Sequence, residues 1–163
     1  MDSTQKQNIL VVEDNENTRR LLETILRSAG YDVTPAPDAE EGLRILNGNA
    51  PVDLVLLDLF LPGADGIQFL RARADMEADR QPPVIVVSAT EDMDTLRPQL
   101  RELGAKMALR KPFDVQELLD GVSQHATKRT GKASPVATAS AAKAASAAKP
   151  ARAKAKGKST TKS

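Results

Sequence analysis

Two short apolar runs that each end in acidic residues constrain the fold of this chain most strongly. Ile9–Val12 is followed by Glu13 and Asp14, and the largely apolar run Val52–Leu57 is followed by Asp58. Such runs, separated by longer amphipathic segments, are typical of buried strands in a parallel sheet. Ligands of open parallel sheets bind beyond the carboxyl ends of the strands, where the strand order reverses. We therefore expect these three carboxylates to share one crevice.

Three carboxylates in one crevice need a compensating charge. At a separation of about 4 Å and an effective dielectric constant of about 20, each pair repels by roughly 4 kcal/mol. A bound divalent cation would supply this positive charge.

The whole stretch from residue 8 to about 126 alternates short apolar runs with amphipathic ones, which predicts repeated βα units around a parallel sheet. The five strands are predicted at Asn8–Glu13, Asp32–Pro35, Leu54–Asp58, Val84–Val87 and Met107–Leu109. Gly30 marks the end of the first helix. Helix-capping aspartates precede three later apolar stripes, at Asp38, Asp65 and Asp114. Pro98 lies inside the segment Glu91–Leu103 and predicts a broken or kinked helix there.

The charge of the chain is divided sharply at Thr127. Up to that residue there are 13 Lys and Arg against 22 Asp and Glu, whereas residues 128–163 carry 10 Lys and Arg and no acid. This last segment contains 12 Ala and Val136 as its only larger aliphatic residue, so it cannot build a core. We expect a disordered N-terminus over residues 1–7, a folded domain over 8–127 and a disordered Ala/Lys-rich basic tail over 128–163.

The absence of cysteine excludes disulfides, thiolate metal sites and a cysteine nucleophile. No apolar stretch approaches the roughly 18 residues of a membrane span. We expect a cytoplasmic protein without a membrane partner.

Taken together, four motifs resemble the receiver domain of two-component response regulators. They are Glu13-Asp14, Asp58, Val84–Thr90 and Leu109–Phe113, and Asp58 is followed at the family's usual offsets by Pro62, Asp65 and Gly66. The resemblance spans about residues 8–126. It implies a flavodoxin-like (βα)5 three-layer sandwich with the parallel sheet order 2-1-3-4-5.

The resemblance also implies a role for each site residue. Asp58 would be the phosphoacceptor, and Glu13, Asp14, Asp58 and the backbone carbonyl of Phe60 would hold Mg²⁺. Lys111, before a cis peptide to Pro112, would contact the phosphoryl oxygens, and Ser88 would donate a hydrogen bond to them. A rival interpretation of Ser88 is a strand-end hydroxyl that bonds nearby backbone. The protein would catalyse only its own phosphorylation and dephosphorylation.

The sequence departs from the family on the output side. Ala108 stands where most receivers carry a Tyr or Phe that changes rotamer on activation, and Pro98 lies in the same region. Phe60 and Leu61 either shape access to the site or fold inward as core, and we favour the core interpretation for both.

The leading function is a stand-alone response regulator. A histidine kinase or phosphotransfer protein would phosphorylate Asp58, and the state would be reported to a protein target. A phosphate sink or relay intermediate is the rival within the class. A metal-dependent phosphohydrolase is a third alternative, but Phe60 occupies the place of the second acid that this chemistry usually needs.

The tail offers a different class of function, an architectural nucleic-acid binder modulated by the receiver. Residues 128–163 resemble the tails of linker histones and bacterial histone-like proteins in composition, and ten cations favour non-specific DNA or RNA binding by counterion release. Two alternatives are a solvated tail without a ligand and a tail that folds back on the acidic domain.

Overall fold

The computed structural model describes residues 5–61, 63 and 65–126. The predicted basic tail over residues 128–163 lies outside the described residues, as does most of the predicted disordered N-terminus. The elements are β1 (Asn8–Val12), α1 (Glu16–Ser28), β2 (Asp32–Ala36), α2 (Ala39–Asn47), β3 (Leu54–Leu57), α3 (Gly66–Ala74), the short 3-10 helix η1 (Ala78–Arg80), β4 (Val84–Ser88), α4 (Met93–Glu102), β5 (Ala105–Arg110) and α5 (Val115–His125).

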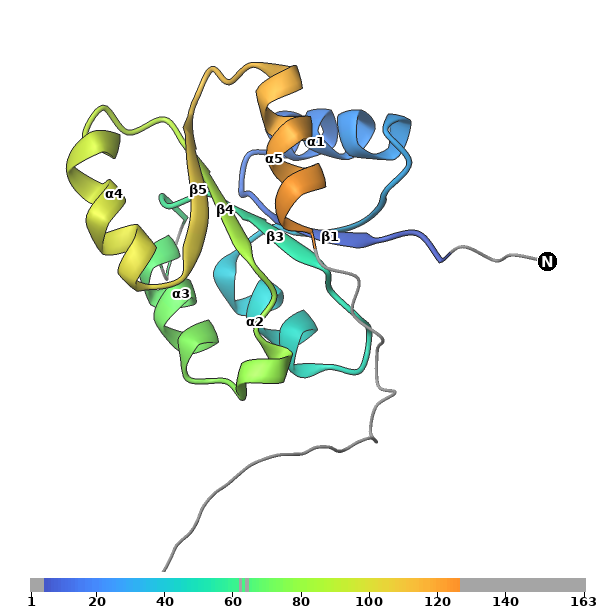
Figure 1. The fold of residues 1–163 in the computed structure, drawn as a ribbon, viewed down its shortest axis with the longest axis horizontal. Coiled ribbons are helices and arrows are strands. Elements are labelled where there is room, and N and C mark those ends of the chain that lie inside the picture. The colour runs from blue at the N-terminus through green and yellow to red at the C-terminus, as the bar shows by residue number, and fades with distance from the viewer. Residues whose placement is uncertain (1–4, 62, 64, 127–163) are drawn as a thin grey trace, which may run out of the picture. The chain divides into compact units, whose positions relative to one another are not determined.

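The five strands form one parallel sheet in the order β2-β1-β3-β4-β5 (Figure 1). This confirms the predicted flavodoxin-like fold and its strand order. The predicted strands are correct to within one or two residues, and β5 differs most because it begins at Ala105. Since β1 and β3 are neighbours in the centre of the sheet, their carboxyl ends lie side by side.

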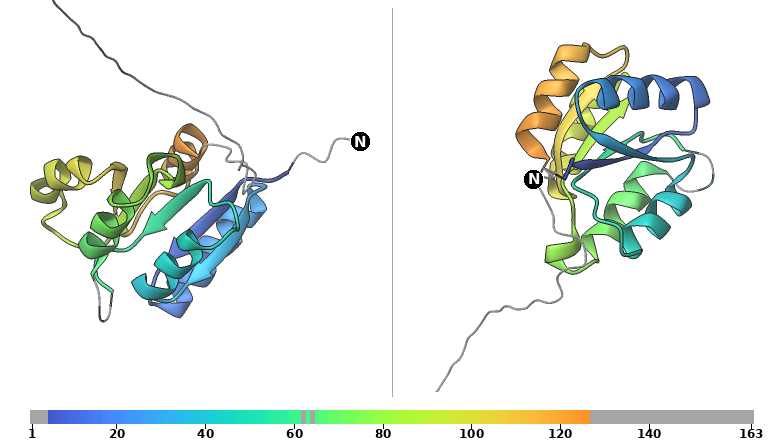
Figure 2. Two further views of the ribbon diagram at one scale, coloured as in Figure 1. Left: turned by 90° about the horizontal axis from the view of Figure 1, so that it is seen from below. Right: turned by 90° about the vertical axis from the view of Figure 1, so that its right-hand side faces the viewer.

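Side chains alternate between two buried layers along the central strands. In β1, Ile9 and Val11 pack with Leu22 and Leu26 of α1, whereas Leu10 and Val12 face the opposite layer. The helices α1 and α5 therefore cover one face of the sheet and α2, α3 and α4 cover the other, as Figure 2 shows from two sides. A sheet covered on both faces explains why its strands are continuously apolar.

Side-chain caps begin the four helices that follow loops at the carboxyl ends of β1, β2, β3 and β5. Asn15, Asp38, Asp65 and Asp114 each accept a hydrogen bond from the backbone N–H three residues further on. The three aspartate caps confirm the predicted helix starts. Gly30, with φ of 99°, follows α1 in the left-handed region, as expected of a residue that ends a helix.

The helix α4 is continuous through Pro98, so the predicted break is wrong, whereas the alternative of a kink stays a prediction. Its anchors, Met93 and Leu100, are fully buried on either side of the proline. Pro98 itself is exposed, and the backbone carbonyl that loses its partner belongs to Asp94, which is also exposed. Water can satisfy that carbonyl, so tertiary packing outweighs the local cost of the proline.

Over the residues that the structure describes, no helix combines the length and the apolar character needed to cross a membrane.

Candidate functional site

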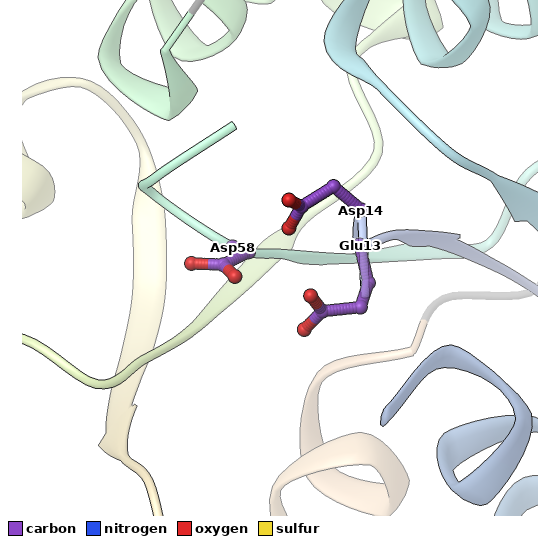
Figure 3. A group of neighbouring side chains, drawn as sticks. All are labelled: Glu13, Asp14 and Asp58. Atoms are coloured by element: carbon purple, nitrogen blue, oxygen red, sulfur yellow. The ribbon is translucent and has the colours of Figure 1, made fainter. Parts of the chain in front are cut away.

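The carboxyl ends of β1 and β3 bring three acidic side chains together. Val12 and Leu57 are paired across the two strands, so Glu13 and Asp58 leave the sheet as neighbours. The backbone continues the pairing by one step, because the Asp58 N–H donates to the Val12 carbonyl at 3.0 Å. One carboxylate oxygen from each of Glu13, Asp14 and Asp58 lies within 4.8 Å of the other two. Figure 3 shows these three side chains gathered in one place.

The cluster has a buried floor and an open side. Glu13 is 2% exposed and Asp58 is 8% exposed, whereas Asp14 is exposed to solvent. Two of the three carboxylates are therefore poorly hydrated, and Asp14 is the one that solvent reaches.

Lys111 supplies a positive charge to the buried pair. Its Nζ lies 2.6 Å from Glu13 Oε2 and 3.1 Å from Asp58 Oδ2. The turn after β5 holds it there, because the Lys111 N–H donates to the Ser88 carbonyl at 2.8 Å. The Lys111–Pro112 peptide is cis, as the resemblance implied.

Burial and charge shift two pKa values in the cluster. Burial raises the pKa of the Glu13 carboxyl, against the hydrogen bonds from Lys111 and the Asn15 N–H, which lower it. Burial lowers the pKa of the Lys111 ammonium, but its hydrogen bond to Glu13 and the charges of Asp58 and Glu13 outweigh burial and raise it. Lys111 therefore stays charged at neutral pH.

Asp58 is held through both of its oxygens. Oδ2 accepts from Lys111, and Oδ1 accepts from the Phe60 N–H at 3.1 Å. That second bond fixes the backbone of the loop, while the Phe60 side chain is 61% exposed and Leu61 is buried. The core interpretation is therefore right for Leu61 and wrong for Phe60, which lies on the surface beside the phosphoacceptor candidate.

Gly66 lets α3 approach the end of β3 closely. A Cβ at this position would lie 2.7 Å from the Asp58 carbonyl oxygen and 2.7 Å from Leu59 Cα. Both are backbone atoms that cannot move aside easily, so only glycine fits beneath the aspartate.

The arrangement agrees with a known family. The family model of the response regulator receiver domain matches residues 9–123. The chain belongs to this family. Receiver domains are phosphorylated by histidine kinases or phosphotransfer proteins, and they bind Mg²⁺ at an acidic pocket.

Several curated relatives are similar over this receiver domain. The sporulation initiation phosphotransferase F of Bacillus subtilis is 34% identical over 117 residues, which are 72% of this chain and 91% of the relative. The KDP operon transcriptional regulatory protein KdpE of Escherichia coli is 40% identical, over 68% of this chain and 47% of the relative. A probable transcriptional regulator ycf27 of Porphyridium aerugineum is 40% identical, over 80% and 52%. The chain thus matches about half the length of the two transcriptional regulators.

Solved receiver structures have the same fold. A response regulator receiver protein from Pseudomonas putida matches 74% of this chain and 98% of its own, with a TM-score of 0.68 and 30% identity. The response regulator TrrA of Thermotoga maritima, solved in complex with Mg²⁺ and BeF, matches 72% of this chain and 97% of its own, with a TM-score of 0.63 and 30% identity.

Ser88 lies at the end of β4. The residue is fully buried, and its Oγ has no hydrogen-bond partner among the described residues. The rival interpretation, in which Ser88 bonds nearby backbone, is therefore not seen. Ala108 is buried opposite Val86 in the neighbouring strand, so the receiver lacks an aromatic ring at this position.

The donor set suits a hard cation. Within residues 5–61, 63 and 65–126, Glu13, Asp14 and Asp58 form the cluster able to hold a metal ion, and all three offer carboxylate oxygens. Oxygen ligands are those that Mg²⁺ prefers. The Phe60 backbone carbonyl belongs to the residue that binds Asp58 through its N–H, and its part in metal binding stays a prediction.

Two residues that donate hydrogen bonds to Glu13 are not predicted from the sequence. The Asn15 N–H donates to Glu13 Oε1 at 3.1 Å, and Arg19 Nη1 donates to the Glu13 carbonyl at 2.8 Å. A helix that begins just after the acidic pair tilts its side chains back toward that pair, which is the signal that would have indicated Arg19.

Proposed function

We propose that Asp58 accepts a phosphoryl group from a histidine kinase or a phosphotransfer protein and that the phosphorylated receiver signals by protein contact. The observation that carries the proposal is the Asp58 carboxylate itself. It ends the central strand β3 and lies between an ammonium group 3.1 Å away and two further carboxylates.

The chemistry is a direct transfer. An Asp58 carboxylate oxygen attacks phosphorus and forms the acyl phosphate bond, while the bond from phosphorus to the donor nitrogen breaks and its electron pair leaves with the imidazole. The Lys111 ammonium group, which now contacts the Asp58 carboxylate, would contact the incoming phosphoryl oxygens instead. Glu13, Asp14, Asp58 and the Phe60 carbonyl would hold Mg²⁺, which neutralises charge on the phosphoryl group when bound.

Ser88 gives the receiver a means to sense the new group. Its buried hydroxyl, which has no hydrogen-bond partner within the described part of the chain, can donate to a phosphoryl oxygen, and this bond recovers part of the cost of burying the hydroxyl alone. With Ala108 in the neighbouring strand, the change would reach α4 through the loop after Ser88 rather than through an aromatic side chain. A phosphate sink, which needs little output, is the alternative that Ala108 favours.

The test uses Mg²⁺ and acetyl phosphate as a small donor. We expect the wild-type protein to gain one acid-stable, base-labile phosphoryl group and Asp58→Asn to gain none. Asp32→Asn is a matched control. Asp32 is an exposed aspartate at the amino end of β2, whereas the candidate site lies at the carboxyl ends of the parallel strands. An adduct that persists in Asp58→Asn would contradict the proposal.

A second candidate function concerns residues 128–163, whose ten cations without a single acid favour non-specific binding to nucleic acid. We propose DNA or RNA as a partner of this segment. Deleting residues 128–163 is expected to abolish binding and its salt dependence in a titration with duplex DNA. Unchanged binding after the deletion would rule out the tail as the anchor.

A further inference from the structure

Arg19 connects α1 to the two acidic residues at the end of β1. Its Nη1 donates to the Glu13 carbonyl at 2.8 Å and lies 3.4 Å from the Asp14 carbonyl. The side chain is half-buried, and it reaches the turn because helical side chains lean toward the N-terminus of their helix. One guanidinium thus contacts the backbone of both residues whose carboxylates join Asp58 in the cluster.

The rest of the turn is fixed from other directions. The Glu13 N–H donates to the Ala36 carbonyl of β2, which continues the sheet, and the Asn15 N–H donates to the Glu13 carboxylate. Asn15 also caps α1 through its side chain. Over the described residues, the backbone of Asp14 is held by fewer hydrogen bonds, and the hydrogen bond to its carbonyl comes from Arg19.

We propose that Arg19 is a positioning residue that holds Glu13 and Asp14 in the orientation needed to bind a divalent cation. The inference rests on the proposed function, since it assumes that this cluster binds Mg²⁺. Asp14 is exposed, so without the bond to its carbonyl its backbone can rotate and carry the carboxylate away from Asp58. Groups that orient metal ligands through hydrogen bonds typically contribute about 10- to 100-fold to metal affinity.

Arg19 also carries a positive charge, which acts in the opposite direction. A cation near the acidic cluster repels Mg²⁺, so removing the guanidinium would tighten binding if charge were the larger effect. The guanidinium contacts carbonyl oxygens on the backbone side of the turn, while the carboxylates project away from that backbone toward Asp58 (Figure 3). We therefore expect positioning to outweigh repulsion.

The experiment measures Mg²⁺ affinity of the full chain by isothermal titration calorimetry. Arg19→Ala is expected to bind Mg²⁺ roughly 10-fold more weakly than the wild type. Arg19→Lys keeps a charge and one donor, and Arg19→Gln keeps a donor without charge, so both are expected to recover part of the affinity. Arg20→Ala is the matched control, because Arg20 is the next residue on α1 and its exposed side chain pairs with Glu16. Its affinity should equal that of the wild type.

The outcomes separate the two proposals. Equal or tighter Mg²⁺ binding by Arg19→Ala, in a protein whose circular dichroism matches the wild type, overturns the positioning role and leaves the proposed function intact. Failure of the wild type to bind Mg²⁺ overturns the metal site and this inference with it. If Arg19→Ala does not fold, Arg19→Gln takes its place: Mg²⁺ binding weaker than that of the wild type supports the role, whereas wild-type or tighter binding refutes it.

Discussion

Replacing Lys111 by methionine removes a cation that contacts two buried carboxylates while keeping the length of the side chain. In the native protein Nζ lies 2.6 Å from Glu13 and 3.1 Å from Asp58. The variant leaves these two acids and Asp14 facing one another without compensation. We expect a clear loss of stability in the absence of divalent cations.

The size of the loss follows from the burial of the three groups. At an effective dielectric constant of about 20, each attraction amounts to roughly 5–6 kcal/mol before desolvation is subtracted. Removing one partner of a fully buried pair costs about 3–5 kcal/mol. The Lys111 side chain is 20% exposed, against 3% and 9% for its two partners, so solvent screens part of the interaction. We expect about 2–3 kcal/mol, which lowers the melting temperature by about 10 °C.

The assay is urea denaturation in a chelating buffer at pH 7 and low salt. Lys106→Met is the control, because Lys106 is an exposed lysine of the same strand. The deficit of Lys111→Met should shrink when Mg²⁺ is added, since the ion replaces the lost charge. A Lys111→Met protein as stable as the wild type under chelation would refute this reasoning.

The stability difference between the wild type and Lys111→Met depends on pH in a direction that follows from two pKa shifts. The pKa of Lys111 is raised in the folded state, so its stabilisation is fully present below the ordinary value of 10.5 and is lost as the pH rises through the raised value. At the acid end, burial raises the pKa of Glu13 above 4.5, so this carboxyl becomes neutral early as the pH falls. The gap between wild type and Lys111→Met should therefore narrow at both ends of the pH range and be widest near neutrality.

Three further substitutions test single features of the site. Ser88→Ala removes a buried hydroxyl without a partner among the described residues and should leave stability equal or raise it by about 1 kcal/mol in urea denaturation, whereas the lifetime of the phosphorylated form should change. Gly66→Ala forces a Cβ to within 2.7 Å of backbone atoms and should cost about 2–3 kcal/mol, measured in the same way. Phe60→Ser alters an exposed side chain and should change stability by less than about 0.5 kcal/mol, while phosphorylation by a partner kinase, followed by intact mass, reports whether the ring takes part in docking.

The fold follows from the sequence because its signals are local and agree with one another. Continuous apolar runs predict strands that are buried on both faces, and the capping residues Asp38, Asp65 and Asp114 predict where helices begin. The strand ends do not follow from local sequence, because a strand extends as far as its neighbour offers partners. Thus β5 begins at Ala105, which pairs with Val84 just before a shift in the register between Val84 and Ile85.

The acids and the lysine of the site could be predicted from the sequence, but the residues that hold them in place could not. Acidic residues at strand ends are visible in the sequence, whereas the path of Arg19 back to the turn depends on the exact start of α1. The exposure of Phe60 depends on the loop backbone, which the bond from its N–H to Asp58 fixes. The continuity of α4 depends on burial of Met93 and Leu100 on either side of Pro98, and this burial outweighs the local signal of the proline.

The most direct measurement locates the phosphoryl group in the protein. The wild type is incubated with Mg²⁺ and acetyl phosphate and reduced with borohydride, which converts an acyl phosphate on aspartate to homoserine, and its peptides are then analysed by mass spectrometry. We expect homoserine at position 58, in a yield that falls when Mg²⁺ is chelated. Unmodified Asp58, or homoserine at Asp14 or another aspartate instead, would contradict it.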